Sequence, residues 1–233
     1  MRYKEEEQDL LPPGSFLPIL EENGLMPLLD RLVVGRVMSW ARDTQAAIAP
    51  RVIPRCSVNL SIDTVRRDEA FGDYVLRGIR KMAVSPAFVS FEVQAVEAQA
   101  FQHALARMLP PLRSAGFAFE LSGFTGEEAA FNLATLLGFS WVKLDGSLSA
   151  TIARDPQAKA RLAAVLQRCR KIGIKTVCTQ IEDAETLAHL RTLPVDYVQG
   201  FGIDRPRMLE GNTPEAARPA PTGSTSRPSS ALR

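Results

Sequence analysis

The sequence predicts an α/β fold, with a modified TIM-type (β/α) barrel as the leading architecture. Short apolar stretches of strand length alternate with amphipathic stretches along almost the whole chain, which is the pattern of βαβ units around a parallel sheet. At least six strand candidates follow one another, with no segment of linker composition between them. A doubly wound open sheet is the second architecture that this alternation allows.

The strands are predicted from short runs of apolar residues. In the first run, Cys56, Val58 and Leu60 alternate with polar neighbours, as in a strand with one buried face. The later runs are bounded by Gly, Pro, Ser or charged residues. The predicted strands are 55–61, 88–93, 117–122, 140–145, 175–181 and 196–201.

The helices are predicted from apolar residues at i, i+3 and i+4 spacing. Pro110 and Pro111 are expected to break or kink the end of one helix, because proline lacks the N–H of the helical ladder. Gly173 is placed to end another. The predicted helices are 25–48, 68–83, 96–113, 127–137, 156–172 and 184–193.

Composition argues against two classes of partner. The 233-residue chain carries a net charge of +2, which is too balanced to predict nucleic acid as the main partner. No stretch approaches the roughly 20 apolar residues of a membrane span. Cys56, Cys169 and Cys178 lie in apolar runs without metal-type spacing, so we predict buried free thiols and a cytoplasmic protein.

Three segments are expected along the chain. Residues 1–15 are charged and then rich in Pro and Gly, which predicts an irregular lead-in. Residues 16–207 form the predicted folded domain. Residues 208–233 are rich in Pro, Ser, Thr, Gly and Ala, which predicts a disordered tail.

Polar residues recur at the ends of the predicted strands, where parallel α/β folds bind ligands. Amides, carboxylates and an ammonium of this kind can hold a metal ion and phosphate oxygens. Taken singly, each of these residues is more typical of a capped turn or a solvated strand end. The residues are Asn59, Glu92, Ser122, Lys143, Asp145, Thr179, Glu182 and Gln199.

The order and spacing of several short motifs between Pro12 and Pro206 resemble the EAL domain family of bacterial cyclic di-GMP phosphodiesterases. The motifs are PPGSFLPILEENGLMPLLDR, SVNLS, FEVQ, KLD and DYVQGF. The resemblance implies an EAL-like barrel with a two-metal site for phosphodiester hydrolysis. The family's Glu-Ala-Leu strand precedes an arginine that matches Arg2, so we expect the barrel to be lacking or truncated at its first strand.

The resemblance also shows departures at the family's acidic positions. Its paired aspartates fall on Ser122 and Gly123, and its proposed general-base glutamate falls on Thr179. Asn59 and Glu92 remain as relic metal ligands. Hard divalent cations need several anionic oxygens, and a threonine hydroxyl is too weak a base to activate water. We therefore predict a degenerate domain that is not an enzyme, for which Mg²⁺ or Mn²⁺ binding is not expected.

The first functional hypothesis is a cyclic di-GMP receptor that regulates without cleaving the nucleotide. The residues predicted to contact the dinucleotide are Arg2, Asp30, Asn59, Lys143, Glu182 and Gln199. Structural alternatives remain for several of them. Asp30 also fits the solvent face of its helix. Lys143 also fits a structural ion pair with Asp145 or Glu182, because an inward charge needs a partner.

The alternative hypothesis is a nucleotide-independent adaptor or anti-regulator that binds a protein partner or forms a homodimer. The segment after Ser122, GFTGEE, differs from the family pattern. Its Glu127 and Glu128 would repel an anionic ligand if they lay near the phosphates. Both residues also fit the first turn of the next helix, where acidic side chains are favourable.

Overall fold

A curved parallel sheet forms the centre of the protein. The computed structural model describes residues 3–4, 10–11, 13–47 and 54–206. Within them, six parallel strands follow one another in sequence order across the sheet. These strands are β3 (Cys56–Asn59), β4 (Val89–Gln94), β5 (Ala118–Phe124), β6 (Trp141–Leu144), β7 (Lys175–Cys178) and β8 (Tyr197–Val198).

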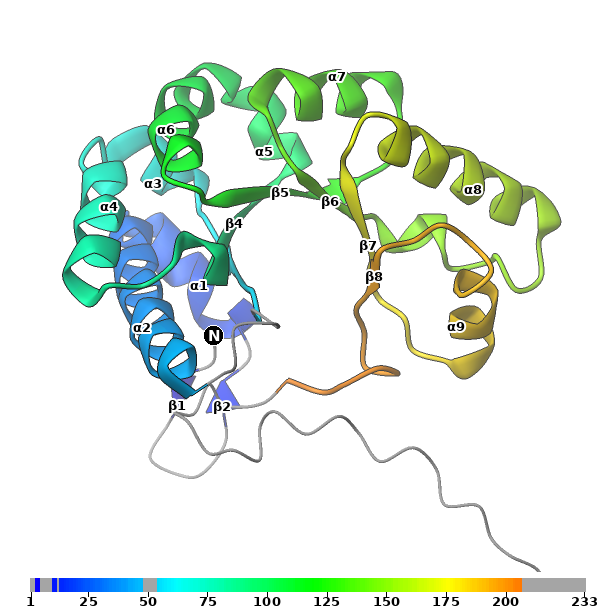
Figure 1. Ribbon diagram of the computed structural model, residues 1–233, viewed down its shortest axis with the longest axis horizontal. Coiled ribbons are helices and arrows are strands. Elements are labelled where there is room, and N and C mark those ends of the chain that lie inside the picture. Colours follow the sequence, from blue (N-terminus) through cyan, green and yellow to red (C-terminus); the bar gives the residue numbers. More distant parts are fainter. Residues whose placement is uncertain (1–2, 5–9, 12, 48–53, 207–233) are drawn as a thin grey trace, which may run out of the picture.

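The strand order distinguishes the two predicted architectures. A doubly wound sheet reverses its strand order at a switch point, whereas this order runs from β3 to β8 without reversal. The sheet curls into an arc with its helices on the convex side, as in a barrel (Figure 1). The prediction of a modified TIM-type barrel is therefore confirmed. In the part of the chain that the structure describes, β3 and β8 are the two edges of the arc.

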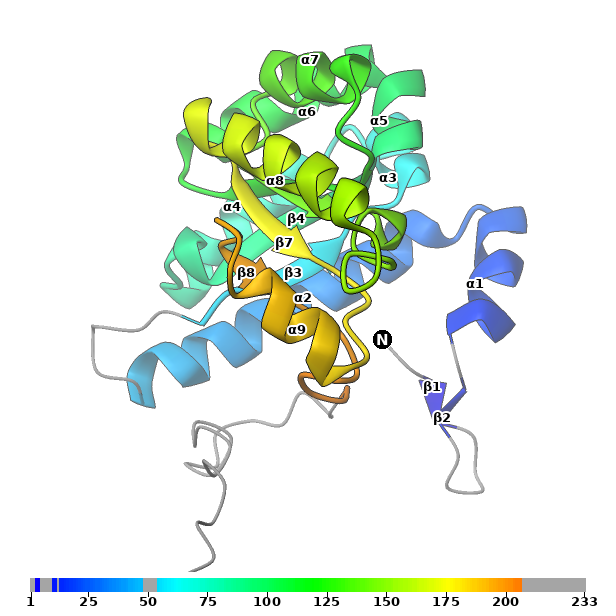
Figure 2. The same ribbon diagram turned by 90° about the vertical axis from the view of Figure 1, so that its right-hand side faces the viewer.

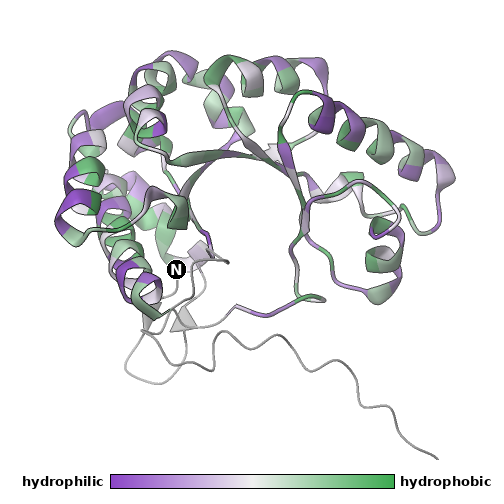
Figure 3. Ribbon diagram, viewed as in Figure 1, coloured by the Kyte–Doolittle hydropathy of each residue, from purple (hydrophilic) through white to green (hydrophobic). Residues whose placement is uncertain are grey.

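Helices other than α1 cover the convex face of the sheet, whereas α1 lies to one side of it (Figures 1 and 2). Their apolar sides pack on apolar residues of the strands, among them the fully buried Phe91, Phe119 and Leu121. Figure 3 shows this amphipathic pattern along the helices. The helices are α1 (Pro13–Glu22), α2 (Met26–Ala47), α3 (Ile62–Arg67), α4 (Phe71–Met82), α5 (Ala95–Ala100), α6 (Gln102–Ser114), α7 (Glu128–Leu137), α8 (Pro156–Lys171) and α9 (Ala184–Leu190), with 3₁₀ turns η1 (Pro86–Phe88) and η2 (Gly146–Leu148).

Regular structure begins earlier than expected. Strand β1 (Tyr3–Lys4) pairs antiparallel with β2 (Leu10–Leu11), and α1 begins at Pro13. The prediction of an irregular lead-in over 1–15 is thus wrong for these segments. Proline is suited to a first helical position, where its missing N–H has no partner in any case. The predicted disordered tail, 208–233, lies outside the described residues.

Two further local predictions need correction. Helix α6 continues through Pro110 and Pro111 to Ser114, because buried Leu109 and Leu112 hold its last turns against the core. Helix α3 had no predicted counterpart, although Ser61 caps its first turn by accepting a hydrogen bond from Thr64 N at 3.1 Å. At six residues α3 is too short for a periodic pattern to predict it.

The cysteines and the helices agree with the predictions of free thiols and of no membrane-spanning stretch. Cys169 and Cys178 are buried and Cys56 is half-buried, all as free thiols. No helix among the described residues is both long and apolar enough to cross a membrane. Gly173 follows the end of α8 with φ of +76°, the left-handed conformation that glycine adopts at low cost.

Candidate functional site

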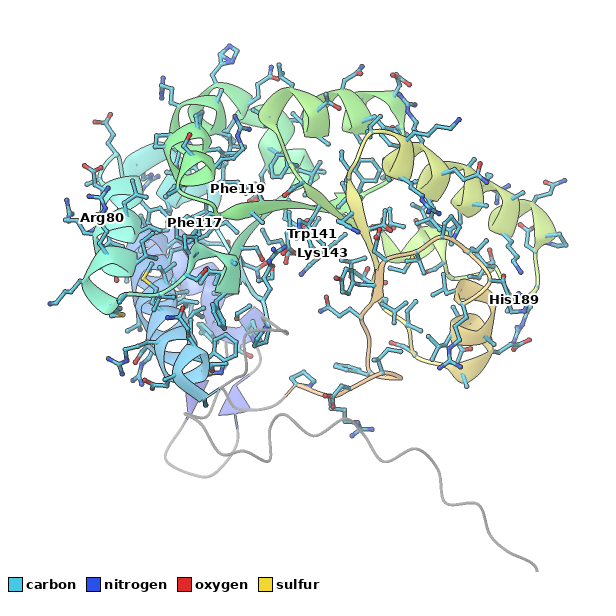
Figure 4. All side chains as sticks on the ribbon, in the orientation of Figure 1. Arg80, Phe117, Phe119, Trp141, Lys143 and His189 are labelled. Carbon is cyan, nitrogen blue, oxygen red and sulfur yellow. The ribbon has the colours of Figure 1, made fainter. Side chains whose placement is uncertain are left out.

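A cleft of about 570 Å³ opens at the carboxyl ends of the strands. Because parallel strands end at the same edge of a sheet, side chains far apart in the sequence meet there. Figure 4 places Lys143 on the concave side of the arc and Phe119 on the helix-covered side. All the predicted strand-end residues line the cleft: Asn59, Glu92, Ser122, Lys143, Asp145, Thr179, Glu182 and Gln199.

The floor of the cleft is a buried ionic cluster around Lys143. Its Nζ lies 2.5 Å from Glu92 Oε2 and 3.5 Å from Glu120 Oε2. The side chains of Lys143, Glu92 and Glu120 are only 12%, 14% and 5% exposed. The predicted structural ion pair of Lys143 therefore exists, but its partners are Glu92 and Glu120. The prediction of Asp145 or Glu182 as the partner was wrong, because the carboxylates that reach the lysine are those of Glu92 and Glu120, whose strands β4 and β5 pair so that the two residues lie side by side.

Glu120 is a site residue that sequence reasoning missed. Its Oε2 accepts a hydrogen bond from Ser57 Oγ at 2.9 Å, and its Oε1 accepts one from Ser90 Oγ. Two-residue alternation along β5 places Glu120 on the same face as Ser122, which had been assigned to the site. That alternation was the signal that could have found Glu120. Pairing of Glu92 with Glu120 in the β4–β5 register brings the two carboxylates together.

The positions that carry acids in the family hold groups of different chemistry. Thr179 Oγ1 donates a hydrogen bond to Leu144 O at 2.8 Å, and Ser122 Oγ lies 3.4 Å from Val93 O. Both hydroxyls thus point to main-chain carbonyl oxygens. Gly123 lies at an irregularity in the β5–β6 register and has φ of +66°, so it contributes only main chain to the cleft.

The loops after β7 and β8 position the remaining polar side chains. Gln199 N donates to Cys178 O at 2.8 Å, and Ile181 N donates to Gln199 O at 3.1 Å. These bonds extend the β7–β8 pairing to the cleft. Gln180 adopts φ of +59°, a left-handed conformation that costs a non-glycine residue on the order of 1 kcal/mol.

Asp145 and Glu128 serve the local structure around the cleft. Asp145 accepts hydrogen bonds from the side chain and main chain of Ser147, which hold the pKa of its carboxyl below the usual value. Glu128 is the first residue of α7 and forms two hydrogen bonds with Arg168 of α8, at 2.6 and 2.8 Å. The first-turn interpretation of Glu128 is therefore confirmed, and the residue does not line the cleft.

One predicted nucleotide-binding residue, Asp30, is not among the residues that line the cleft, and another cannot be placed. Arg2 lies outside the described residues. Asp30 is 4% exposed and lies under the start of α3, where it accepts hydrogen bonds from Ser61 N at 2.9 Å and Thr64 Oγ1 at 2.5 Å. Burial raises the pKa of the Asp30 carboxyl. The alternative that Asp30 faces solvent is wrong, because its helix packs that face on α3 and α4.

Among the described residues, the cleft does not present the array of carboxylates that two divalent cations need. Two such ions need several carboxylates in close array. In the described part of the chain, no three His, Cys, Asp or Glu side chains converge on one point. Glu92 is paired with the Lys143 ammonium, and Asp145 is engaged by Ser147. Asn59 and Glu182 complete the candidate ligands at the rim.

A barrel-type sheet with a polar cleft at its strand ends defines an α/β barrel domain. This chain belongs to the EAL domain family, whose model matches residues 1–206. The cyclic di-GMP phosphodiesterase PdeB of Shewanella oneidensis is 28% identical over 209 residues, covering 90% of this chain and 24% of its own length. PdeF of Escherichia coli is 24% identical over 209 residues, covering 90% and 27%. The chain thus spans about a quarter of the length of these relatives.

Solved structures of EAL domains share the fold. The FimX EAL domain of Xanthomonas citri in complex with cyclic di-GMP has a TM-score of 0.81 at 19% identity, covering 90% of this chain and 81% of that one. The FimX EAL domain of Pseudomonas aeruginosa bound to cyclic di-GMP has a TM-score of 0.80 at 18% identity, covering 91% and 84%. At these identities the likeness establishes the fold.

Proposed function

We propose that this EAL domain binds cyclic di-GMP without hydrolysing it and acts as a receptor or regulator in bacterial cyclic di-GMP signalling. The observation that carries the proposal is the chemistry of the cleft. It retains an ammonium and amides at the ends of its strands, while Ser122, Gly123 and Thr179 replace the acids of the family. Neither hydroxyl among them can serve as the general base, because an alcohol is far too weak a base to take a proton from water near neutral pH.

The size and polarity of the cleft support a dinucleotide ligand. Its volume of about 570 Å³ lies within the range of roughly 300–1,000 Å³ of small-molecule sites. Gln199 and Asn59 offer amides that can both donate and accept hydrogen bonds to guanine edges or phosphate oxygens. Lys143 offers the cationic group of the floor, and Glu182 offers a carboxylate that can accept from guanine N–H groups.

We propose that the domain works in the cytoplasm without a resident Mg²⁺ or Mn²⁺. The Lys143 ammonium neutralises Glu92 at 2.5 Å, so a divalent ion would have to displace a positive charge that the carboxylate already holds. In the family reaction, two divalent ions activate water and stabilise the leaving oxygen. In this chain the cleft residues bind and orient the ligand, and the reaction lacks its general base.

Isothermal titration with cyclic di-GMP tests the proposal, run once with Ca²⁺ and once with EDTA. We expect micromolar or tighter binding in both, together with no linear pGpG above a buffer control in Mg²⁺ or Mn²⁺. Gln199→Ala should weaken binding. Gln157→Ala, on the outer helix α8, changes the same residue type outside the cleft and should not. Metal-dependent pGpG formation would show that the domain is an active phosphodiesterase.

A specific observation favours a second candidate, a nucleotide-independent adaptor that binds a protein partner or a second copy. Tyr197 and Phe201 are 54% and 64% exposed beside the β8 edge of the sheet, and Ile203 follows them. Exposed apolar residues next to the last strand of the described sheet suit an interface. Absence of heat and of a thermal shift, with protein shown to be folded by circular dichroism, would favour this function over the receptor.

A further inference from the structure

The ionic cluster beneath the cleft contains a carboxylate that does not reach the cleft surface. Glu120 is 5% exposed at its side chain and is not among the residues that line the cleft. It contacts Lys143, which does line it. Glu120 can therefore affect a ligand only through its contact with Lys143 or through the electrostatic field of its own carboxylate.

The contacts of the Lys143 ammonium lie at the floor of the cleft. Nζ of Lys143 donates hydrogen bonds to Glu92 Oε2 at 2.5 Å and Ser57 Oγ at 3.5 Å. It also forms an ion pair with Glu120 Oε2 at 3.5 Å. To reach a phosphate in the cleft, the ammonium has to release part of this set.

Two serine hydroxyls hold the Glu120 carboxylate in place beside Lys143. Ser57 Oγ lies 2.9 Å from Glu120 Oε2 and 3.2 Å from Glu92 Oε2. A hydroxyl carries one hydrogen, and the shorter contact assigns it to Glu120. Ser90 donates to the other oxygen of Glu120. With each oxygen accepting a hydrogen bond, the carboxylate is fixed in place.

The charges at the floor do not cancel. Among the described residues, Glu92 and Glu120 bring two negative charges against the single positive charge of Lys143. A net negative charge in a site of low dielectric opposes the approach of an anion.

We propose that Glu120 is a positioning residue that holds the Lys143 ammonium at the floor of the cleft and so limits the affinity of the cleft for an anionic phosphodiester. The effect on ligand affinity rests on the proposed function. The hold on Lys143 does not, and it can be measured without any nucleotide.

The first experiment measures Lys143 itself. Brief labelling with acetic anhydride, read by mass spectrometry, compares Lys143 with Lys175 in the same protein. Lys175 is also paired with a carboxylate, Asp196 at 2.9 Å, but is 56% exposed. We expect Glu120→Gln to label Lys143 at least several-fold faster than the wild type, because the ammonium loses the carboxylate oxygen at 3.5 Å that helps to hold it at the floor. The rate at Lys175 should not change.

The second experiment measures affinity for cyclic di-GMP. Glu120→Gln should bind on the order of tenfold more tightly at low salt, the factor for one unit charge about 10 Å away at an effective dielectric constant of about 20. The gain should shrink at high salt, since screening weakens the removed repulsion. Glu128→Gln removes the same charge from the outer face of α7 and should stay within about twofold of the wild type.

The outcomes separate the two proposals. Faster labelling of Lys143 with no nucleotide binding in any variant upholds the positioning role and rejects the receptor function. Unchanged labelling of Lys143 in folded Glu120→Gln rejects the positioning role, whatever the affinity. If Glu120→Gln does not fold, Glu120→Asp provides the same test, because its shorter side chain withdraws the carboxylate from Nζ while keeping the charge. Unchanged Lys143 labelling in that variant also rejects the role.

Discussion

Replacing Lys143 with methionine should destabilise the protein strongly. Methionine keeps the length and apolar stem of lysine but removes the charge, which leaves Glu92 and Glu120 as two buried carboxylates without a cation. Glu92 Oε2 and Glu120 Oε2, which lie 2.5 and 3.5 Å from Nζ, would then face each other without a cation between them. Breaking a buried ion pair by removing one partner costs about 3–5 kcal/mol. We expect a loss of that size in the free energy of unfolding.

Urea unfolding followed by circular dichroism measures this loss. Lys175→Met is the matched control, because it also removes a lysine from a carboxylate, at a pair whose lysine is 56% exposed. Such surface pairs contribute about 0–1 kcal/mol. The double variant Lys143→Met with Glu120→Gln should recover part of the loss, since it removes one of the unpaired charges. If Lys143→Met is no more destabilising than Lys175→Met, the buried cluster does not stabilise the fold as argued.

Three further predictions concern other parts of the chain. Burial raises the pKa of Asp30 above its ordinary 3.8, so the stability this group contributes is present below that pH and is lost as pH rises through the folded value. Urea titrations between about pH 4 and 7 give the free energy of unfolding of the wild type and of Asp30→Asn. The difference between the two, wild type minus variant, should therefore fall as pH rises. A difference that rises with pH would contradict a raised pKa for Asp30. Burial raises the pKa of Cys178 to about 12, so a thiol reagent at about pH 8 should modify it more than roughly 100-fold more slowly in folded than in urea-unfolded protein; equal rates would show that the thiol is accessible. Gly126→Ala places a Cβ 2.6 Å from Val165 Cγ2, whereas Gly173→Ala meets no atom within 4 Å, and both positions have φ near +80°. In thermal unfolding the first should cost about 1–3 kcal/mol more than the second, for overpacking, and equal losses would exclude the steric argument.

The alternation of strands and helices was predictable because each element has its own hydrophobic period. Apolar and polar residues alternate in β3 and β5, with Val58 between Ser57 and Asn59 and Glu120 between Phe119 and Leu121. Helix α8 keeps its buried residues on one side. Elements too short to show a hydrophobic period were not predicted. Helix α3 and the β1–β2 pair are too brief to show a period, and the start of α3 depends on a contact with another helix, that of Ser61 N with Asp30.

The candidate site was predictable to the level of which strand ends carry polar groups. Asn59, Thr179 and Gln199 each follow an apolar run, and all three line the cleft. Their roles in nucleotide binding stay predictions. The partners of Lys143 were missed, because two-residue alternation along β5 could have placed Glu120 on the cleft face but its contact with Lys143 depends on how separate strands lie side by side.

Composition and periodicity therefore suffice for the fold class and for the edge of the sheet at which a ligand would bind, because both follow from local hydrophobic pattern. The buried cluster of Glu92, Glu120 and Lys143 was decided only in the tertiary structure. Its members come from three strands, and the register between those strands sets which side chains meet on the concave face. Register is set by the pairing of segments that are far apart in the sequence, so it cannot be predicted from any single local stretch of the chain.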